Sequence, residues 1–484
     1  MFAINLNLTT FAVELLFLLT GLGIFLVDKF IKNKNYAYYI SLIALTVGFF
    51  IILFTPFGEF TSAFKTDFYS TTLKFFLLIA FFLIIFISYS YLQTFKALNF
   101  GEYYGLLLFS MMGAFIMLSA QDLLTLFLGM ELMSIPVYFL IATGYVYKRA
   151  SIEGALKYFI VGSLASLLFL LGLGIVYYLM GSVYFKDIFL KLTQNIYKKE
   201  LTTALFLIIG AFSIKLSLVP FHMWAPDAYE ASPLPITSFL ASLIKFALFG
   251  ALIKLIIVAF SPLRLDLGSL LIPISLLTIL IGALLAIKQD NIIRLLAYSS
   301  IAHAGYASLG LVTGDFSGYG FTIFYMYIYL FMTIGTFALL IYLVRIKQEF
   351  LHIPSLAGIS KDLPLMSFFI LLFFFSLAGI PPTAGFMAKF YIFIALLKAN
   401  FLWVALLGLL FSVVGAYPYL KVIKIVYMDE PIWHIAKLPY SITFLIPLLI
   451  SAIVILFFGV FPKILVDFIQ RTLYLYLSFL YFHF

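Results

Sequence analysis

Residues 201–224 read LTTALFLIIGAFSIKLSLVPFHMW, an apolar run that carries one lysine, Lys215, and one proline, Pro220. The run is long enough to cross the hydrocarbon core of a bilayer, which takes about 20 residues of helix. Pro220 has no backbone N–H, so the carbonyl of Leu216 loses its helical partner. A free carbonyl inside a membrane requires water or polar side chains, and the stretch therefore predicts a broken helix that lines a hydrated cavity.

The rest of the chain has the composition of a membrane protein. Of its 484 residues, 65% are hydrophobic and 10% are charged, whereas a soluble domain is about 45–50% apolar and about a quarter charged. Apolar runs of spanning length lie at 8–28, 37–55, 72–92, 102–119, 122–146, 151–180, 200–220, 232–260, 267–286, 292–313, 318–344, 364–396, 400–428 and 440–461. Such runs form helices because lipid cannot satisfy open backbone groups. The predicted fold class is an all-α polytopic membrane protein with about 14 transmembrane helices.

Two blocks of similar length predict an internal repeat. Residues 102–260 and 267–428 each hold five spans, and the fourth span of each is interrupted, by Pro220 in one and by residues 379–382 (GIPP) in the other. Because five is odd, the second block is inverted relative to the first, as in transporters with inverted repeats and discontinuous helices. The predicted parts are a three-helix segment (1–101), two five-helix inverted repeats (102–260 and 267–428) with helices 7 and 12 broken, and a C-terminal helix and tail (429–484).

Charge and cysteine content exclude several classes of function. The net charge is +9, but the basic residues are scattered through short loops, which argues against nucleic-acid binding. Cysteine is absent, which excludes disulfides, thiolate metal sites and iron–sulfur ligation. If the chain belongs to a redox complex, the redox centres lie in other subunits.

The distribution of lysine and arginine predicts the orientation. Loops after odd-numbered spans hold fourteen of them, and the other side holds nine. The fourteen are Lys29, Lys32, Lys34, Lys96, Lys148, Arg149, Lys288, Arg294, Arg345, Lys347, Lys361, Lys421, Lys424 and Lys437. Because cytoplasmic loops carry the excess of positive charge, both termini are predicted on the non-cytoplasmic side.

Six lysines remain that are counted on neither side, and all lie within the predicted spans: Lys74, Lys157, Lys215, Lys245, Lys254 and Lys389. A charge at mid-helix costs about 2.5–3.5 kcal/mol on insertion scales, so each needs a reason. Lys74 and Lys254 lie toward span ends, where the side chain can reach the interface, and for Lys254 a buried role is equally open. Lys215, Lys245 and Lys389 are deep, and Lys389 follows its proline break much as Lys215 precedes its own. They are candidates for proton transfer, with structural ion pairs as the alternative.

Glu131, near the middle of the fifth span, is the expected counter-ion, and no other carboxylate is expected so deep. Burial disfavours the ammonium form of lysine and a nearby carboxylate favours it, so a lysine held between the two can exchange protons near neutral pH. Lys157 is either a second partner of Glu131 or a residue that reaches the membrane surface. His303, in the middle of the tenth span, either relays protons or is a hydrogen-bonded structural histidine.

Two glycine pairs, Gly21 with Gly23 and Gly172 with Gly174, lie within apolar helices and lack the strand that a nucleotide site requires. We interpret them as helix-packing glycines.

Four stretches carry a family resemblance: 215–230 (KLSLVPFHMWAPDAYE), 131–136 (ELMSIP), 298–306 (YSSIAHAGY) and 379–386 (GIPPTAGF). They are similar to the antiporter-like subunits of bacterial respiratory complex I, and to the subunit N branch more than to L or M. The resemblance runs over most of residues 100–430. Pro418 departs from the family pattern and leaves the geometry of the thirteenth span open.

The resemblance implies a proton-pumping subunit of NADH–quinone oxidoreductase, with two half-channels joined at mid-membrane by a polar axis. The proton-carrying positions of the family match Glu131, Lys215, Lys245 and Lys389. It also implies location in the bacterial inner (plasma) membrane and partners among the other membrane-arm subunits. NADH, flavin, iron–sulfur clusters and quinone are expected in those partner subunits, and no cofactor or metal site is expected in this chain.

Other functions stay open at this point. A homologous subunit of a multisubunit cation/proton antiporter or of a membrane-bound hydrogenase would share these motifs. A lipid-linked transferase would need paired carboxylates in its outer loops, where only Asp122 and Asp315 are found.

The orientation can be tested with reporter fusions. A reporter placed after Phe484 is expected to report a non-cytoplasmic location, and one placed within 347–361 a cytoplasmic location, because of the basic bias of the loops. The measurement is reporter activity in intact cells, with both fusions expressed at equal levels. The reverse result at either site would show the orientation to be wrong.

Overall fold

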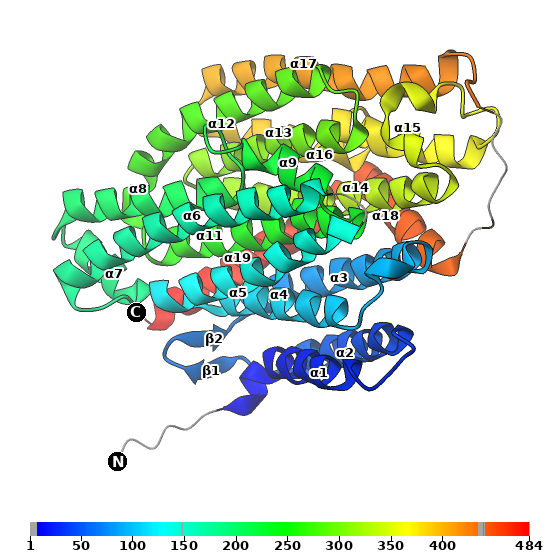
Figure 1. The fold of residues 1–484 in the computed structure, drawn as a ribbon. Coiled ribbons are helices and arrows are strands. Elements are labelled where there is room, and N and C mark those ends of the chain that lie inside the picture. Colours follow the sequence, from blue (N-terminus) through cyan, green and yellow to red (C-terminus); the bar gives the residue numbers. More distant parts are fainter. Residues whose placement is uncertain (1–6, 147–148, 434–438, 440, 484) are drawn as a thin grey trace.

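The computed structural model describes residues 7–146, 149–433, 439 and 441–483, and almost all of the regular structure in this part is helical (Figure 1). Two residues of the orientation argument, Lys148 and Lys437, lie outside the described residues. The first part of the chain contains η1 (Leu8–Phe11), α1 (Ala12–Asp28), α2 (Asn35–Phe54), β1 (Gly58–Thr61), β2 (Phe64–Thr66), α3 (Phe68–Thr94) and η2 (Lys96–Leu98).

The next part corresponds to the first predicted repeat. It contains α4 (Glu102–Ser119), α5 (Leu123–Ala142), η3 (Thr143–Val146), α6 (Ala150–Met180), α7 (Phe185–Thr193), α8 (Lys198–Lys215), α9 (Trp224–Ala231), α10 (Leu234–Phe239), the π-helical turn η4 (Leu240–Ile244) and α11 (Lys245–Val258).

The remainder corresponds to the second predicted repeat and the tail. It contains η5 (Ser261–Leu263), α12 (Arg264–Ile287), α13 (Ile292–Val312), α14 (Phe316–Ile346), η6 (Gln348–Leu351), η7 (Ile353–Leu356), α15 (Pro364–Ala378), α16 (Ala384–Lys398), α17 (Leu402–Met428), α18 (Ile442–Val460) and α19 (Pro462–His483). Helix α17 runs unbroken through Pro418.

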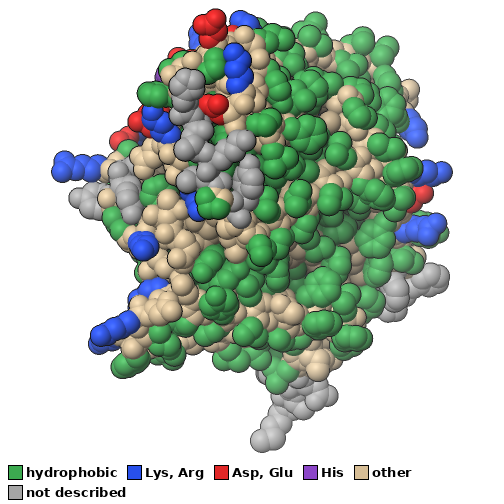
Figure 2. All heavy atoms as spheres, turned by 90° about the vertical axis from the view of Figure 1, so that its right-hand side faces the viewer, with side chains coloured by type: hydrophobic (Ala, Val, Ile, Leu, Met, Phe, Trp, Pro, Cys, Tyr) green, Lys and Arg blue, Asp and Glu red, His purple; other side chains and the backbone are tan. Residues whose placement is uncertain are grey.

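Within the described residues, 12 helical segments are long and apolar enough to cross a membrane. Two further predicted spans are not among them. Helix α8, in the span 200–220, carries four charged residues, and the span 364–396 is divided into the short helices α15 and α16. Figure 2 shows one face of the molecule, on which hydrophobic side chains cover most of the centre and Lys and Arg side chains gather toward the left and right edges. An apolar belt between charged margins is the surface expected of a protein that lies in lipid.

The two predicted helix breaks are confirmed. Helix α8 ends at Lys215 and α9 begins at Trp224, so residues 216–223 form a non-helical connection around Pro220. Helix α15 ends at Ala378 and α16 begins at Ala384, with Pro381 and Pro382 between them. Each proline stops its helix because it cannot donate to the ladder and clashes with the preceding turn.

One end of the helix bundle is organised by backbone contacts between loops, and we call it the hairpin side. The hairpin of β1 and β2 pairs with the loop before α5 through Phe64 and Ala120, and that loop pairs with the segment before α7 through Asp122 and Tyr184. Helix α7 is amphipathic and buries Phe185, Ile188 and Leu192. In Figure 1 the hairpin and α7 lie at the left.

The packing of α6 on α8 depends on a glycine. A Cβ added at Gly172 would lie 2.8 Å from the backbone oxygen of Ala204 in α8, whereas one added at Gly174 would meet nothing within 4 Å. Gly21 is also closely packed, since an added Cβ would lie 2.6 Å from the Phe109 ring. A Cβ added at Gly23 would meet nothing within 4 Å. The prediction of helix-packing glycines is therefore right for Gly21 and Gly172 and wrong for their two partners within this chain.

This difference gives a test within a single helix turn. Gly172→Val should displace α8, which carries Lys215, at an overpacking cost of about 1–3 kcal/mol. The control Gly174→Val should be tolerated. The measurement is the amount of intact, detergent-solubilised protein and its thermal stability; equal stability of the two variants would contradict the packing role of Gly172.

Candidate functional site

Lys215 lies at the end of α8, at the first helix break, and its ammonium is enclosed by α5. The Nζ atom lies 3.1 Å from Oε1 of Glu131 and donates to the Ser134 hydroxyl at 2.9 Å and to the Tyr138 hydroxyl at 3.4 Å. Ser166 of α6 donates to the same carboxylate oxygen at 2.7 Å. The Lys215 side chain is 1% exposed and that of Glu131 20%. The expected ion pair exists, and three acceptors match the three N–H groups of lysine.

Lys245 is the first residue of α11 and directly follows the π-helical turn η4. A π-turn inserts one extra residue into the helix and is frequent at functional sites. The fully enclosed Nζ atom donates to the backbone oxygen of Ser300 in α13 at 3.0 Å. Sequence reasoning found the lysine but missed the π-turn, because a continuous apolar run gives no signal of it.

Lys389 in α16 reaches back to the end of α15. Its Nζ atom donates to the backbone oxygen of Ala378 at 2.8 Å, to that of Leu377 at 3.3 Å and to the Ser412 hydroxyl at 3.3 Å. The last carbonyls of a helix have no intrahelical partner and carry partial negative charge, so they suit a cation. Gly379 caps α15 at φ +82°, and a Cβ there would lie 2.9 Å from Cδ of Lys389. The break thus supplies both the acceptors and the space for the lysine.

His303 lies between the two distal lysines. Its Nδ1 atom is 2.7 Å from the Tyr325 hydroxyl, and the charges of Lys389 and Lys245 both act on the ring. A cavity of about 10 Å³ adjoins it, lined among others by Ser299, His303, Lys389 and Tyr419. That volume is at the lower limit for one water molecule, which needs two to four polar partners. The lining supplies them.

Polar and aromatic side chains connect Lys215 with Lys245. Tyr138 packs edge-on against Tyr158, which stacks on Trp224 at 4.6 Å between ring centroids. The Tyr229 hydroxyl lies 3.3 Å from the hydroxyl of Ser300, the residue whose backbone oxygen binds Lys245. We call the row from Glu131 through Lys215, Lys245 and His303 to Lys389 the axis.

Of the two roles considered for Lys157, the pairing with Glu131 is wrong, whereas an exposed position is what the structure shows. Its side chain is 41% exposed, and its Nζ atom lies 2.7 Å from Oδ2 of Asp227 and 2.7 Å from Oε1 of Glu153, rather than on Glu131. Asp227 also binds Nη1 of Arg294 at 2.9 Å. Burial acts to raise the pKa of Asp227, but hydrogen bonds from Lys157 and Arg294 outweigh it and hold that pKa below its ordinary value.

Lys74 and Lys254 are both buried, which corrects the expectation for Lys74 and, for Lys254, decides for the buried role that was equally open. Lys74 is 3% exposed and lies 2.5 Å from Oε1 of Glu14, and Lys254 is 1% exposed and lies 3.2 Å from Oδ2 of Asp67. Glu14, in the first turn of α1, is more enclosed than Glu131, since its side chain is 1% exposed against 20%. Neither partner could be found from sequence, because they are 60 and 187 positions away.

The geometry can be compared with known proteins. Residues 120–415 match the family described as "NADH:quinone oxidoreductase/Mrp antiporter, TM". The chain belongs to this family. The matched range contains every axis residue. The chain is 35% identical to NADH-quinone oxidoreductase subunit N of Trichlorobacter lovleyi over 483 residues, which are 97% of each chain. The resemblance to the subunit N branch is thereby confirmed.

Solved structures agree with this membership. A chain of respiratory complex I from Thermus thermophilus, determined with bound aureothin, superposes with a TM-score of 0.79 at 27% identity and covers 94% of this chain and 98% of its own. A chain of the Mrp complex from Dietzia sp. DQ12-45-1b gives a TM-score of 0.83 at 19% identity, covering 96% and 97%. At that identity the second likeness concerns the fold alone.

The Glu131–Lys215 pair can be tested by removing one charge. Glu131→Gln preserves shape but leaves the enclosed ammonium without its anion, and breaking a fully buried pair costs about 3–5 kcal/mol. Because the Glu131 side chain is one-fifth exposed, the cost here is smaller and the complex should still assemble. Proton pumping per electron transferred should fall.

The control is Glu153→Gln, which removes a carboxylate from a lysine at an exposed position, since Glu153 is 67% exposed. It should leave pumping unchanged. If an assembled Glu131→Gln variant pumps at the native ratio in sealed vesicles, Glu131 is only a structural partner of Lys215.

Proposed function

We propose that this protein is the proton-translocating subunit N of a bacterial NADH–quinone oxidoreductase. The observation that carries the proposal is the seating of three deep lysines at three interruptions of the helical backbone, with His303 between two of them. A charge in lipid is expensive and marks a functional site by default. Relatives named as subunit N over nearly the full chain support the assignment.

In this proposal protons move along the axis by exchange between neighbouring groups. Lys215, Lys245 and Lys389 alternate between ammonium and amine, and Glu131 holds Lys215. His303, with a water molecule in the adjoining cavity, passes protons between Lys245 and Lys389. Lys157 and Arg294 both bind Asp227 beside the first half of the axis. We assign Lys157 a role in balancing charge there. Electron transfer in other subunits drives the exchange.

The same proposal includes the finer architecture. The chain crosses the membrane 14 times when the two broken spans, α8 and α15 with α16, are added to the 12 continuous ones. Residues 102–260 and 267–428 form the inverted repeats, and both termini lie on the non-cytoplasmic side of the bacterial plasma membrane. NADH, flavin, iron–sulfur clusters and quinone are assigned to partner subunits of the complex.

The alternative is a homologous subunit of a cation/proton antiporter or a membrane-bound hydrogenase, and it is supported by the family description, which includes Mrp antiporters, and by the fold. The Mrp chain is 19% identical to this one, against 35% for a subunit N. The chains that co-purify in mild detergent would decide between them.

Arginine substitution separates charge from proton exchange. Lys215→Arg and Lys245→Arg keep a positive charge, but a guanidinium does not deprotonate in proteins. We therefore expect both variants to assemble and to pump poorly, with Lys→Ala at least as damaging. The measurement is proton pumping per electron transferred in sealed vesicles, after a mild-detergent gel has confirmed the intact complex.

A matched control is Lys421→Arg, because Lys421 is 31% exposed and pairs with Asp290 at 3.5 Å. It should pump at the native ratio. Arginine variants of Lys215 and Lys245 that also pump at the native ratio would leave these lysines as simple ion-pair partners and would refute the relay.

A further inference from the structure

A second group of enclosed charges lies outside the axis, where α1, α3 and α11 meet. Lys254 of α11 binds Oδ2 of Asp67 at 3.2 Å and the backbone oxygen of Leu118 at 3.0 Å. The Glu14–Lys74 pair of α1 and α3 lies close enough for Lys74 to act electrostatically on Lys254. The axis uses none of these residues. Four charged groups enclosed among membrane-spanning helices need an explanation of their own.

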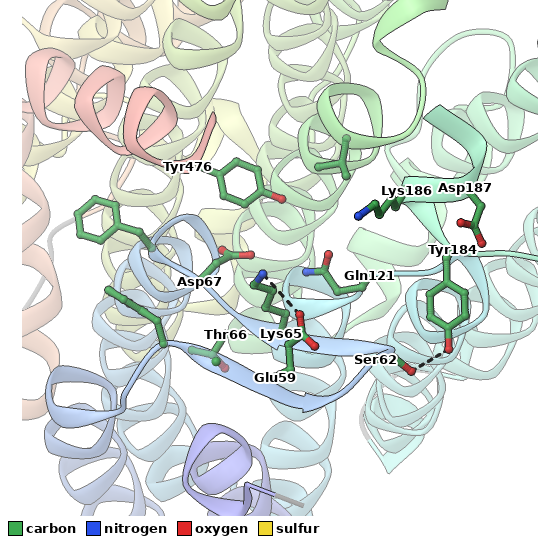
Figure 3. Close-up of a pocket in the computed structure, with 14 residues that line it drawn as sticks. Glu59, Ser62, Lys65, Thr66, Asp67, Gln121, Tyr184, Lys186, Asp187 and Tyr476 are labelled. Carbon is green, nitrogen blue, oxygen red and sulfur yellow. Dashed lines mark hydrogen bonds and ion pairs between the residues drawn. The ribbon is translucent and has the colours of Figure 1, made fainter. Parts of the chain in front are cut away.

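A large pocket on the hairpin side opens onto this group. Its volume is about 980 Å³, and its wall includes Asp67, Lys65, Gln121 and Tyr476, contributed by α3, β2, the loop before α5 and α19. Figure 3 shows the Asp67 carboxylate, the Lys65 ammonium and the Tyr476 hydroxyl pointing into the pocket. Lys254 lies directly behind Asp67, so the pocket leads to an enclosed ion pair.

Polar atoms without partners surround the same ion pair. Within the described part of the chain, Oγ1 of Thr71, Oγ of Ser119, Nε2 of Gln121 and Oη of Tyr476 are enclosed and make no hydrogen bond. Thr71 lies one turn after Asp67, and Ser119 follows the residue whose carbonyl binds Lys254. Enclosed polar groups that lack a protein partner are ordinarily satisfied by bound water. The interior around Lys254 is thus suited to hold water.

Helix α11 links this group to the axis. Lys254 follows Lys245 by nine residues, a rise of about 13.5 Å that places the two side chains on opposite faces of the helix. Between them, the fully enclosed Tyr69 hydroxyl donates to the backbone oxygen of Gly250 at 2.8 Å. Leu73 and Leu118 pack against α11 at Gly250, where an added Cβ would lie 2.7 Å from Cδ1 of Leu73.

We propose that Asp67 and Lys254 form a proton-transfer pair through which the axis exchanges protons with the pocket on the hairpin side. This inference rests on the proposed function. The Lys254 ammonium gives one proton to the Asp67 carboxylate, which leaves an amine and a carboxylic acid. The acid releases that proton to water in the pocket and regains its charge. The amine takes a new proton from interior water that Lys245 supplies, so one proton crosses per cycle.

The competing role is a structural pin between α3 and α11. Asp67 already has a structural task, because its Oδ1 caps α3 by accepting from the backbone N–H of Ser70 at 2.7 Å. That task leaves Oδ2 for Lys254. A pin alone requires neither the pocket beside the pair nor the unpartnered polar atoms around it.

The first arm of the test probes hydration in the assembled complex. Because the chain has no cysteine, a single introduced thiol identifies its own position in this subunit. Ser119→Cys should react with a membrane-impermeant cationic methanethiosulfonate reagent added from the hairpin side. The control Ser110→Cys lies in the same helix and is equally enclosed, but Ser110 donates to the backbone oxygen of Met133 at 2.6 Å, so it should stay unlabelled.

The second arm separates proton transfer from a structural pin. Asp67→Asn keeps the helix cap, since asparagine is an equally good N-cap residue, but cannot take a proton. Lys254→Arg keeps the positive charge, but its guanidinium cannot release a proton. Both variants should assemble and lose proton pumping per NADH oxidised, while Ser119→Cys is labelled. Pumping at the native ratio in both variants, or equal protection of Ser119→Cys and Ser110→Cys, would overturn the proposal.

The outcome is distinguishable from failure of the proposed function. If Lys245→Arg pumps normally, the axis itself is refuted. If Lys245→Arg fails and the Asp67 and Lys254 variants pump normally, the axis stands and its protons leave by another route.

Discussion

An ammonium group enclosed by apolar helices must find acceptors for its N–H groups. Lys245 binds the backbone oxygen of Ser300 within α13, but regular helices offer few such acceptors. Their carbonyls are already engaged, and lipid supplies nothing. The interruptions of the backbone in this protein answer that constraint. The α15 break exposes the carbonyls that hold Lys389, the α8 break ends the helix at Lys215, and a π-turn precedes Lys245. The three deep lysines of the axis therefore lie where the helices are interrupted.

The two breaks meet the constraint in different ways. Lys215 has a full counter-charge in Glu131 and two hydroxyl acceptors, whereas Lys389 is held by backbone dipoles and one serine. A carboxylate can itself be protonated and a helix terminus cannot, so the first half of the axis has one more exchangeable group than the second. His303 and the adjoining one-water cavity, beside Lys389, restore an exchangeable group there.

The sequence predicted features that local chemistry determines. The proline breaks followed from Pro220 and Pro381, and the deep lysines followed from the cost of charge in apolar runs. Contacts between distant segments did not follow: Glu14 pairs with Lys74 across 60 positions and Asp67 with Lys254 across 187. The same holds for Lys157, to which α9 brings Asp227 from 70 positions away. The π-turn has no signature in a uniformly apolar run.

Asp227 shows why fixed charges accompany exchangeable ones. Its two oxygens bind Lys157 of α6 at 2.7 Å and Arg294 of α13 at 2.9 Å, and Glu230 holds the same guanidinium at 2.9 Å. Helices α6 and α13 belong to different five-helix blocks, and arginine stays charged throughout, so this link persists whatever the protonation of the axis. In the proposed function, exchange of a proton at Lys245 would add or remove a charge beside Ser300 of α13, and so would change the force between the two blocks. A permanent ion-pair network at one margin keeps the blocks in register while that force varies, and this allows the interior lysines to change charge without separating the helices that enclose them.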